Sequence, residues 1–202
     1  MVTVSYAITA WNEHEELDRL LSLLHKCKRD VDEIILQLDT TATKEVREVA
    51  EKYQGVTTIE FPLKKDFATY KNNLVKSCKC SIIVFIDADE YVSEEFLEYL
   101  PGILESNEDV DVISIPRWNT VDGLTQEHIV KWRWRVDELG RVNFPDLQTR
   151  IMKNNGNMKW EGKVHERITG WKTISRLPDE FCLYHPKTID RQEKQNALYE
   201  SI

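Results

Sequence analysis

Three acidic residues directly follow a five-residue apolar run. Residues 82–86 (Ile-Ile-Val-Phe-Ile) lead into Asp87-Ala88-Asp89-Glu90. The run does not alternate with polar residues, which predicts a strand buried on both faces, as in the middle of a parallel sheet. The acids then lie at the carboxyl end of the strand, where open α/β sheets bind their ligands. Two carboxylates held there suit a divalent metal ion that carries phosphates. The alternative interpretation is that the acids cap the following turn and helix.

The Asp87-x-Asp89 pair has two other interpretations. In an EF-hand loop, Asp87, Asp89 and Glu98 would occupy the first, third and twelfth positions. Val92 stands where that loop needs glycine, and a strand precedes it, so this motif is excluded. Phosphohydrolases of the haloacid-dehalogenase type also have Asp-x-Asp after a strand, with the first Asp as nucleophile. Their pair usually ends the first strand, whereas here it ends the fourth predicted strand, and Asp87 as nucleophile remains an alternative. The chain has neither G-x-x-x-x-G-K-[ST] nor G-x-G-x-x-G, so P-loop and Rossmann dinucleotide sites lack their phosphate cradles.

Alternating strands and helices are predicted for the first 90 residues. Strands are expected at 2–9, 31–38, 57–61 and 82–89, with helices between them. The first helix carries a leucine stripe from Leu17 to Leu24, and Asp66 is expected to cap the third helix. This order predicts a parallel sheet with right-handed crossovers, with Asp39 at the end of a strand beside the ligand crevice.

The second half of the chain has a different character. A helix capped by Ser93 is expected to run through Leu100 and to be followed by Pro101-Gly102. Strands are predicted at 111–115 and 148–152 and a polar helix at 188–201, whereas 118–144 and 160–166 show no regular pattern. The change near residue 105 indicates a change of role within one fold and not a linker.

Composition limits the class of protein. The 202 residues are 41% hydrophobic and 31% charged, and the net charge of −8 argues against a nucleic-acid-binding surface as the main function. No run approaches 18 apolar residues and the start shows no signal-peptide pattern, so neither a transmembrane helix nor a signal peptide is expected. The cysteines at 27, 78, 80 and 182 lack C-x-x-C spacing. They are expected as reduced thiols of a cytoplasmic protein, with or without peripheral contact to a membrane surface.

Several sequence pieces, taken together, resemble a known enzyme family. They are Ala10-Trp11-Asn12-Glu13, Asp39 before hydroxyl residues, Asp66-Phe67-Ala68 with Lys71-Asn72, Ile86-Asp87-Ala88-Asp89-Glu90, Asp146-Leu147-Gln148-Thr149-Arg150-Ile151, Trp160-x-Gly162-x-Val164-His165-Glu166, and His185 before a helix with Arg191, Lys194 and Asn196. Over nearly the whole chain, this series is similar to the inverting nucleotide-sugar glycosyltransferases of family 2, which have the GT-A fold. It is nearest to the branch that adds sugars to lipopolysaccharide cores and to peptides. Two pieces depart from the family pattern: Lys71 replaces the usual Arg, and Thr40-Thr41-Ala42-Thr43 replaces Gly-Ser-Thr-Asp.

The resemblance implies an α/β fold of the GT-A type, with a mostly parallel central sheet flanked by helices and a smaller sheet on the acceptor side. It implies a single domain over residues 1–202. Residues 1–105 would bind the nucleotide sugar, and residues 106–202 would bind the acceptor and supply a closing C-terminal segment. The implied reaction is inverting transfer from a nucleoside diphosphate sugar, in particular a UDP-sugar, to a hydroxyl of a glycan, lipid-linked or peptide acceptor. A phosphohydrolase and a nucleotide-binding module without turnover remain the alternatives.

The resemblance also implies the site residues. The leaving diphosphate needs a cation, and Mn²⁺ or Mg²⁺ would be held by Asp89, Asp87 and His185. The nucleotide sugar would contact Ala10, Asn12, Glu13, Asp39, Asp66, Lys71, Asp87, Ala88, Arg191 and Lys194. An inverting transfer needs a general base for the acceptor hydroxyl. Glu166, beside His165, is the first candidate for this base and Asp146 the second, and Trp160 is the expected aromatic contact of the acceptor.

Overall fold

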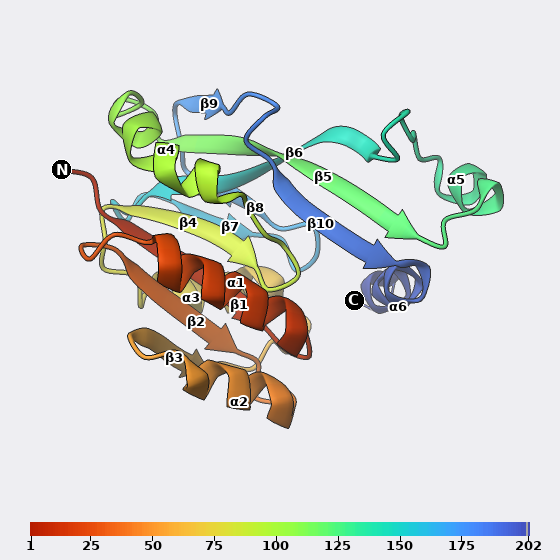
Figure 1. Ribbon diagram of the computed structural model, residues 1–202, viewed down its shortest axis with the longest axis horizontal. Helices are drawn as coiled ribbons and strands as arrows, with labels where there is room; N and C mark the ends of the chain where they lie inside the picture. The colour runs from red at the N-terminus through yellow and green to blue at the C-terminus, as the bar shows by residue number, and fades with distance from the viewer. Residues whose placement is uncertain (201) are drawn as a thin grey trace.

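The computed structural model describes residues 1–200 and 202, and its strands form one large and one small sheet (Figure 1). The first half contains β1 (Val4–Ala10), α1 (His14–Cys27), β2 (Glu33–Leu38), α2 (Lys44–Lys52), β3 (Val56–Glu60), α3 (Phe67–Val75), β4 (Ile82–Asp87) and α4 (Glu94–Glu105). The second half contains β5 (Val112–Asp122), α5 (Gln126–Trp132), β6 (Val142–Lys153), β7 (Lys159–Glu161), β8 (Arg167–Thr169), β9 (Ile174–Arg176), β10 (Leu183–Thr188) and α6 (Ile189–Glu200). The order in the large sheet is β10-β5-β6-β4-β1-β2-β3, with β9 also paired to β5, while β7 and β8 form the small sheet.

Strand β4 is buried on both faces, as its unbroken apolar run predicts. Val84 and Ile86 belong to the core formed with α1, α2 and α4. Ile83 and Phe85 belong to a second core on the other face, formed with α3 and the small sheet. Strands β4, β1, β2 and β3 pair in parallel, which confirms the predicted βα series and the predicted α/β class. The apolar strands are thus covered by helices on both sides, and their carboxyl ends are left for polar residues.

The second half extends the same sheet with longer and more polar strands. β6 pairs antiparallel with β4 and β5, and β10 pairs parallel with β5. β5 and β6 span 112–122 and 142–153 and are therefore longer than the predicted 111–115 and 148–152. β10 was not predicted at all, because His185 and Lys187 occupy two of its three buried positions. An apolar pattern cannot reveal a strand whose inward side chains are polar.

Two helices also differ from the prediction. α4 does not end at Leu100 but continues through Pro101 to Glu105. Leu97, Leu100 and Leu104 form a buried stripe across this point, and their packing outweighs the hydrogen bond that proline cannot donate. α5 occupies Gln126–Trp132, a region without a regular pattern. It has no buried residue and begins with a capping box, so local capping rather than an apolar stripe specifies it.

The carboxyl ends of the parallel strands meet the C-terminal helix. Asp66 and Ser93 cap α3 and α4 as predicted. The arrowheads of β2, β4 and β10 point to the same side of the sheet, and α6 lies at that side (Figure 1). No helix in the described part of the chain is long and apolar enough to cross a membrane. All four cysteines are free thiols, and those at 78 and 182 are buried.

Candidate active site

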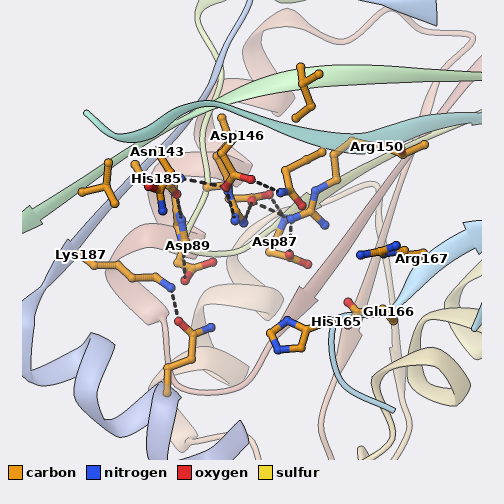
Figure 2. A pocket seen from close by; sticks show the side chains of 18 of the residues that line it. Asp87, Asp89, Asn143, Asp146, Arg150, His165, Glu166, Arg167, His185 and Lys187 are labelled. Atoms are coloured by element: carbon orange, nitrogen blue, oxygen red, sulfur yellow. Dashed lines mark hydrogen bonds and ion pairs between the residues drawn. The ribbon is translucent and has the colours of Figure 1, made fainter. Parts of the chain in front are cut away.

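A cavity of about 760 Å³ lies at the carboxyl end of β4 (Figure 2). Its walls come from the end of β4, from β5, β6 and β10, from α6, and from the loop that joins β7 to β8. Eight of the predicted site residues line it: Lys71, Asp87, Asp89, Asp146, Trp160, His165, Glu166 and His185. The other predicted site residues lie outside this lining: Ala10, Asn12, Glu13, Asp39, Asp66, Ala88, Arg191 and Lys194. The structure therefore brings all the metal and catalytic candidates together in one cavity, with two of the nucleotide candidates, Lys71 and Asp87.

The cavity walls are rich in charge of both signs. The lining carboxylates are Asp87, Asp89, Glu90, Asp146 and Glu166, and the lining lysines and arginines are Lys71, Arg117, Arg150, Arg167 and Lys187. Because the two sets are equal in number, the walls are close to neutral before any ligand binds. A divalent cation and a diphosphate entering together add charges that largely cancel each other.

Asp87 ends β4 with both carboxylate oxygens engaged. Oδ1 accepts a hydrogen bond from Thr9 Oγ1 at 2.9 Å and lies 3.5 Å from Lys71 Nζ, and Oδ2 accepts from Arg150 Nη2 at 2.8 Å. Burial raises the pKa of Asp87, but the charges of Arg150 and Lys71 and the Thr9 hydrogen bond outweigh it and hold this pKa far below its usual value. Asp87 is therefore an ionised carboxylate whose two oxygens are held by Thr9, Lys71 and Arg150.

Glu90 fixes the other side of Arg150. Its side chain is 1% exposed, and Oε1 accepts from Arg150 Nη2 at 2.7 Å and from Arg117 Nη1 at 3.3 Å. Oε2 accepts from the backbone N–H of Asp87 at 3.1 Å. Glu90 thus closes the turn after β4 and holds two arginines of the second half against it.

The side chains of Asp89 and His185 meet in the cavity wall. Asp89 Oδ2 lies 3.2 Å from His185 Nε2 (Figure 2). Burial raises the pKa of Asp89, but the His185 hydrogen bond and charge and the Lys187 charge outweigh it, so this pKa is lowered well below its usual value. An ionised oxygen and an imidazole nitrogen at this distance need a proton or a metal ion to lie with them.

The donor set fits a hard or borderline divalent ion. Ligands about 2.1 Å from an octahedral ion are about 3.0 Å apart when adjacent, close to the Asp89–His185 separation. Oxygen with one imidazole suits Mn²⁺ as well as Mg²⁺. Among the described residues no group of three or more His, Cys, Asp or Glu side chains is arranged to hold a metal. Because the oxygens of Asp87 are engaged elsewhere, Asp89 and His185 are the two side chains that could hold such an ion directly, with phosphate oxygens and water suited to its remaining positions.

Arg117, Asn119 and Arg150, which had no predicted role, join Asp146 in the part of the cavity wall formed by β5 and β6. Arg117 and Asn119 lie two apart on β5, and Asp146 and Arg150 lie four apart on β6. Asp146 Oδ2 accepts from Arg117 Nη2 at 2.7 Å and from Asn119 Nδ2 at 2.9 Å. Asn119 Oδ1 is in turn 2.8 Å from His185 Nδ1. A period of two among polar residues was the signal that could have placed these residues on one face of paired strands.

Glu166 lies in the loop between β7 and β8, opposite Asp87. Its Oε1 pairs with Lys71 Nζ at 2.8 Å, and the same ammonium lies 4.7 Å from the centre of the Trp160 ring. Lys71 is buried between Asp87 and Glu166 and so joins the two candidate centres, which leaves it less accessible to a diphosphate than predicted. Trp160 is 5% exposed and packs edge-on against Phe85, so it belongs mainly to the core.

His165 has a positive φ of 54° in the same loop. Its ring lies 5.4 Å from that of Tyr199 on α6, and the Tyr199 ring also meets Phe67 at 6.0 Å. Burial, with a further contribution from the Glu166 charge, raises the pKa of Tyr199 to about 12. α6 therefore packs, through the neutral phenol of Tyr199, over the loop that carries His165 and Glu166.

The nucleotide candidates of the first half have structural partners already. Asp39 Oδ1 accepts from the N–H of Thr41 at 2.7 Å, and Oδ2 accepts from the N–H of Leu63 at 2.6 Å. These hydrogen bonds outweigh burial and lower the pKa of Asp39. Asp66 accepts from the N–H of Thr69 as the cap of α3. Ala88 is buried.

Glu13 immediately precedes α1, and its carboxylate binds the turn before the helix. Its Oε2 accepts from the backbone N–H groups of Trp11 at 2.8 Å and Asn12 at 3.1 Å. Its Oε1 lies 3.3 Å from Arg191 Nη2. The turn at Trp11-Asn12, directly after Ala10 at the end of β1, is thus tied to α6 through Glu13 and Arg191.

The three C-terminal cations lie in different environments. Arg191 reaches Glu16 at 2.7 Å and Asp89 at 3.6 Å. Lys194 is exposed, on the side of α6 away from the cavity lining. Lys187, which had no predicted role, is buried in the cavity wall and bonds Gln195. Burial lowers the pKa of Lys187, partly offset by the charge of Asp89.

A mostly parallel α/β sheet with an acidic pair after β4 and a histidine from a late strand defines a protein of the GT-A class. The chain belongs to glycosyl transferase family 2, whose sequence model matches residues 5–179.

Relatives and structural neighbours agree with this class. The chain is 24% identical to the SPbeta prophage-derived glycosyltransferase SunS of Bacillus subtilis (strain 168) over 165 residues, 81% of this chain and 34% of SunS. It therefore spans about a third of the length of that curated relative. A crystal structure of TarS from S. aureus matches with a TM-score of 0.65 at 16% identity, over 92% of this chain and 60% of that one. Glucosyl-3-phosphoglycerate synthase from Mycobacterium tuberculosis matches with a TM-score of 0.52 at 19% identity, over 76% and 57%.

Proposed function

We propose that this chain is the catalytic part of a metal-dependent, inverting glycosyltransferase that moves a sugar from a UDP-sugar to an acceptor hydroxyl. The observation that supports this most directly is that the Asp89–His185 pair and the Lys71-bound Glu166 line one cavity. TarS has been crystallised with UDP and with UDP-GlcNAc, and glucosyl-3-phosphoglycerate synthase with Mg²⁺ and UDP. These complexes support UDP as the nucleotide. The acceptor remains open among a glycan, a lipid-linked molecule and a peptide.

Asp89 and His185 would hold Mn²⁺ or Mg²⁺ directly, and Asp87 would orient the site as an ionised neighbour. The ion would supply positive charge for the leaving diphosphate. Lys187 and Arg191 are the C-terminal cations nearest to Asp89 and would add to that charge. Lys194, which is exposed, is the weaker candidate for this role.

Glu166 is the general base that the geometry favours. Lys71 holds its Oε1, so Oε2 can accept the proton of the acceptor hydroxyl while the acceptor oxygen attacks the anomeric carbon. Attack opposite the diphosphate breaks the bond to that leaving group and inverts the configuration in one step. Asp146 is less suited, because Arg117, Asn119 and Gln148 all donate to its carboxylate. Those donors outweigh burial and lower the pKa of Asp146.

The test separates binding from turnover. Thermal shifts with UDP and UDP-GlcNAc, with and without Mn²⁺, would first identify a donor that stabilises the protein, and its hydrolysis or transfer would then be followed. Asp89→Ala should abolish both turnover and the Mn²⁺-dependent part of UDP binding. Glu166→Gln should lower turnover by about 10²–10⁴-fold with donor binding kept. Glu161→Gln, an exposed carboxylate of neighbouring β7, is the matched control.

Three outcomes would contradict the proposal. Unchanged turnover in Asp89→Ala would remove the metal role. A trapped aspartyl-phosphate on Asp87 would indicate a phosphohydrolase. UDP binding that ignores Mn²⁺, with neither hydrolysis nor transfer, would indicate a binding module.

We also propose a cytoplasmic location and a single domain over residues 1–202, with a nucleotide half and an acceptor half. The free thiols are consistent with a reducing compartment. Pairing of β6 with β4 within one sheet supports a continuous domain across residue 105.

A further inference from the structure

Asn119 lies on β5 between a carboxylate and an imidazole. Its Nδ2 donates to Asp146 Oδ2 at 2.9 Å, and its Oδ1 lies 2.8 Å from Nδ1 of His185. An ionised carboxylate can only accept hydrogen bonds, so the amide must turn its NH₂ group toward Asp146 and its oxygen toward His185. An amide oxygen is also only an acceptor. The hydrogen of this pair therefore belongs to Nδ1 of the imidazole.

The amide of Asn119 is not free to reverse. Arg117 donates to Asp146 through Nε at 2.9 Å and Nη2 at 2.7 Å, and Gln148 donates to the other oxygen at 2.8 Å. These donors keep Asp146 ionised and in place. A reversed Asn119 would set its oxygen against the Asp146 carboxylate. That contact would be repulsive, and Asp146 would lose the hydrogen bond that it accepts from Nδ2.

The tautomer decides which imidazole atom faces the cavity. With hydrogen on Nδ1, a neutral His185 carries its lone pair on Nε2, the atom 3.2 Å from Asp89 Oδ2. We infer that Asn119 is a positioning residue that holds His185 as the Nδ1–H tautomer and directs Nε2 to the place beside Asp89 where a divalent ion binds. This inference rests on the proposed metal-dependent function for its consequence, but its geometry is that of the protein alone.

The same contacts join the two aspartates of the Asp-x-Asp motif through the second half of the chain. From Asp87 they run to Arg150, Glu90 and Arg117, all of which are largely buried. They continue through Asp146, Asn119 and His185 back to Asp89. Asn119 is the one amide side chain in this ring and the link that reaches His185. Its loss should therefore affect the imidazole and leave the Asp87 end in place.

The test compares Asn119→Leu, which is close in size but has no polar atoms, with the wild type. Long-range ¹⁵N–¹H correlation spectra of the metal-free protein at about pH 9 report which imidazole nitrogens of His185 carry hydrogen. The wild type should show hydrogen on Nδ1, in addition to any proton that Nε2 shares with Asp89 while the metal is absent. The variant should lose the Nδ1 hydrogen and keep hydrogen on Nε2 alone. Titration with Mn²⁺ should show affinity weakened by about 10–100-fold in Asn119→Leu. The ¹⁴N modulation of bound Mn²⁺ in pulsed EPR should be present in the wild type, reduced in this variant and absent in His185→Ala.

Gln148→Leu is the matched control, because Gln148 also donates to Asp146 yet has no contact with His185. It should keep the tautomer and bind Mn²⁺ within about twofold of the wild type. If Asn119→Leu does not fold, Asn119→Ala removes the same amide oxygen. Its tautomer should shift in the same direction but less completely, because water admitted at this place can also accept from Nδ1–H.

The Nε2–H tautomer in the wild type would overturn the inference, as would an Asn119→Leu protein with unchanged tautomer and Mn²⁺ affinity. Neither result would touch the proposed glycosyl transfer. Absence of Mn²⁺ binding by the wild type would instead count against the proposed function, and the metal-free spectra would still decide the role of Asn119.

Discussion

Arg150 shows how the site keeps buried charges in place. The side chain is 5% exposed and lies between Asp87 and Glu90, with one nitrogen within 2.8 Å of each. Burial would lower the pKa of Arg150, but the two carboxylates outweigh it and raise it, so the guanidinium stays charged. Removing ions from water costs several kcal/mol each, and only close pairing offsets this. The pairing of Arg150 with Asp87 and Glu90 therefore mainly fixes the positions and the ionised state of the two carboxylates, and adds little to net stability.

Arg150→Met tests this at the residue scale. The variant leaves Asp87 and Glu90 buried without their shared cation, so we expect the free energy of unfolding to fall by about 3–5 kcal/mol. Arg176→Met removes the exposed pair with Asp179 and should cost less than about 1 kcal/mol. Urea unfolding at pH 7 measures both. A loss below about 1 kcal/mol in Arg150→Met would mean that the pairing has little structural role.

At the scale of elements, the small sheet of β7 and β8 positions the loop that carries Glu166. β7 packs through Trp160 against β4, and Asn72 of α3 exchanges two hydrogen bonds with the Trp160 backbone at 2.8 Å. Gly170 follows β8 with φ of +89°, and a Cβ there would lie 2.2 Å from the carbonyl oxygen of Asn157. The close approach of these two segments therefore depends on a residue without a side chain.

The same substitution in two elements should have opposite effects. Gly170→Ala should destabilise the protein by at least about 2 kcal/mol, because of the collision with Asn157 and the positive φ. Gly102→Ala lies inside α4, where a Cβ meets open space, and should raise the free energy of unfolding by about 0.5–1 kcal/mol. Thermal and urea unfolding of the two variants measure these changes. Equal effects would show that the small sheet tolerates a shift at 170.

At the scale of the whole molecule, the site exists only where the two halves of the chain meet. The first half supplies Asp87 at the end of β4, Asp89 and Glu90 in the following turn, and Lys71 on α3. The second half supplies the arginines, Lys187, His185 and Glu166. β6 brings these parts together by pairing with β4 and β5 at once. This pairing explains why one polar network can reach from the Asp87-x-Asp89 motif to the loop that carries Glu166.

The sequence predicted the half of the fold that is built from apolar patterns. The apolar run before Asp87 and the leucine stripe of α1 lie in the core as expected, because apolar side chains in these patterns predict burial. The second half could not be predicted in this way, because Arg117, Asn119 and Lys187 replace apolar residues on the faces that turn inward. The side chains that Arg117 and Asn119 bond lie at least 27 residues away along the chain, so no local spacing in the sequence reveals these contacts. The site was therefore predicted as single candidates, and the network that holds them needed the structure.

The paired carboxylates should make the folded protein sensitive to acid. The pKa values of Asp87, Asp89 and Asp146 are all lower in the folded protein than the ordinary value near 3.9. Between the folded and unfolded pKa values, the unfolded chain therefore binds protons that the folded protein does not. The free energy of unfolding rises with pH through this range, and the contribution of the carboxylates is fully present above the unfolded pKa. We expect the free energy of unfolding to be flat from about pH 7 to 5 and to fall by on the order of 2–4 kcal/mol between about pH 5 and 3. Urea unfolding at each pH measures this, and Asp146→Asn should be less stable at pH 7 but show a shallower decline. A decline as steep as that of the wild type would mean that Asp146 does not contribute to it.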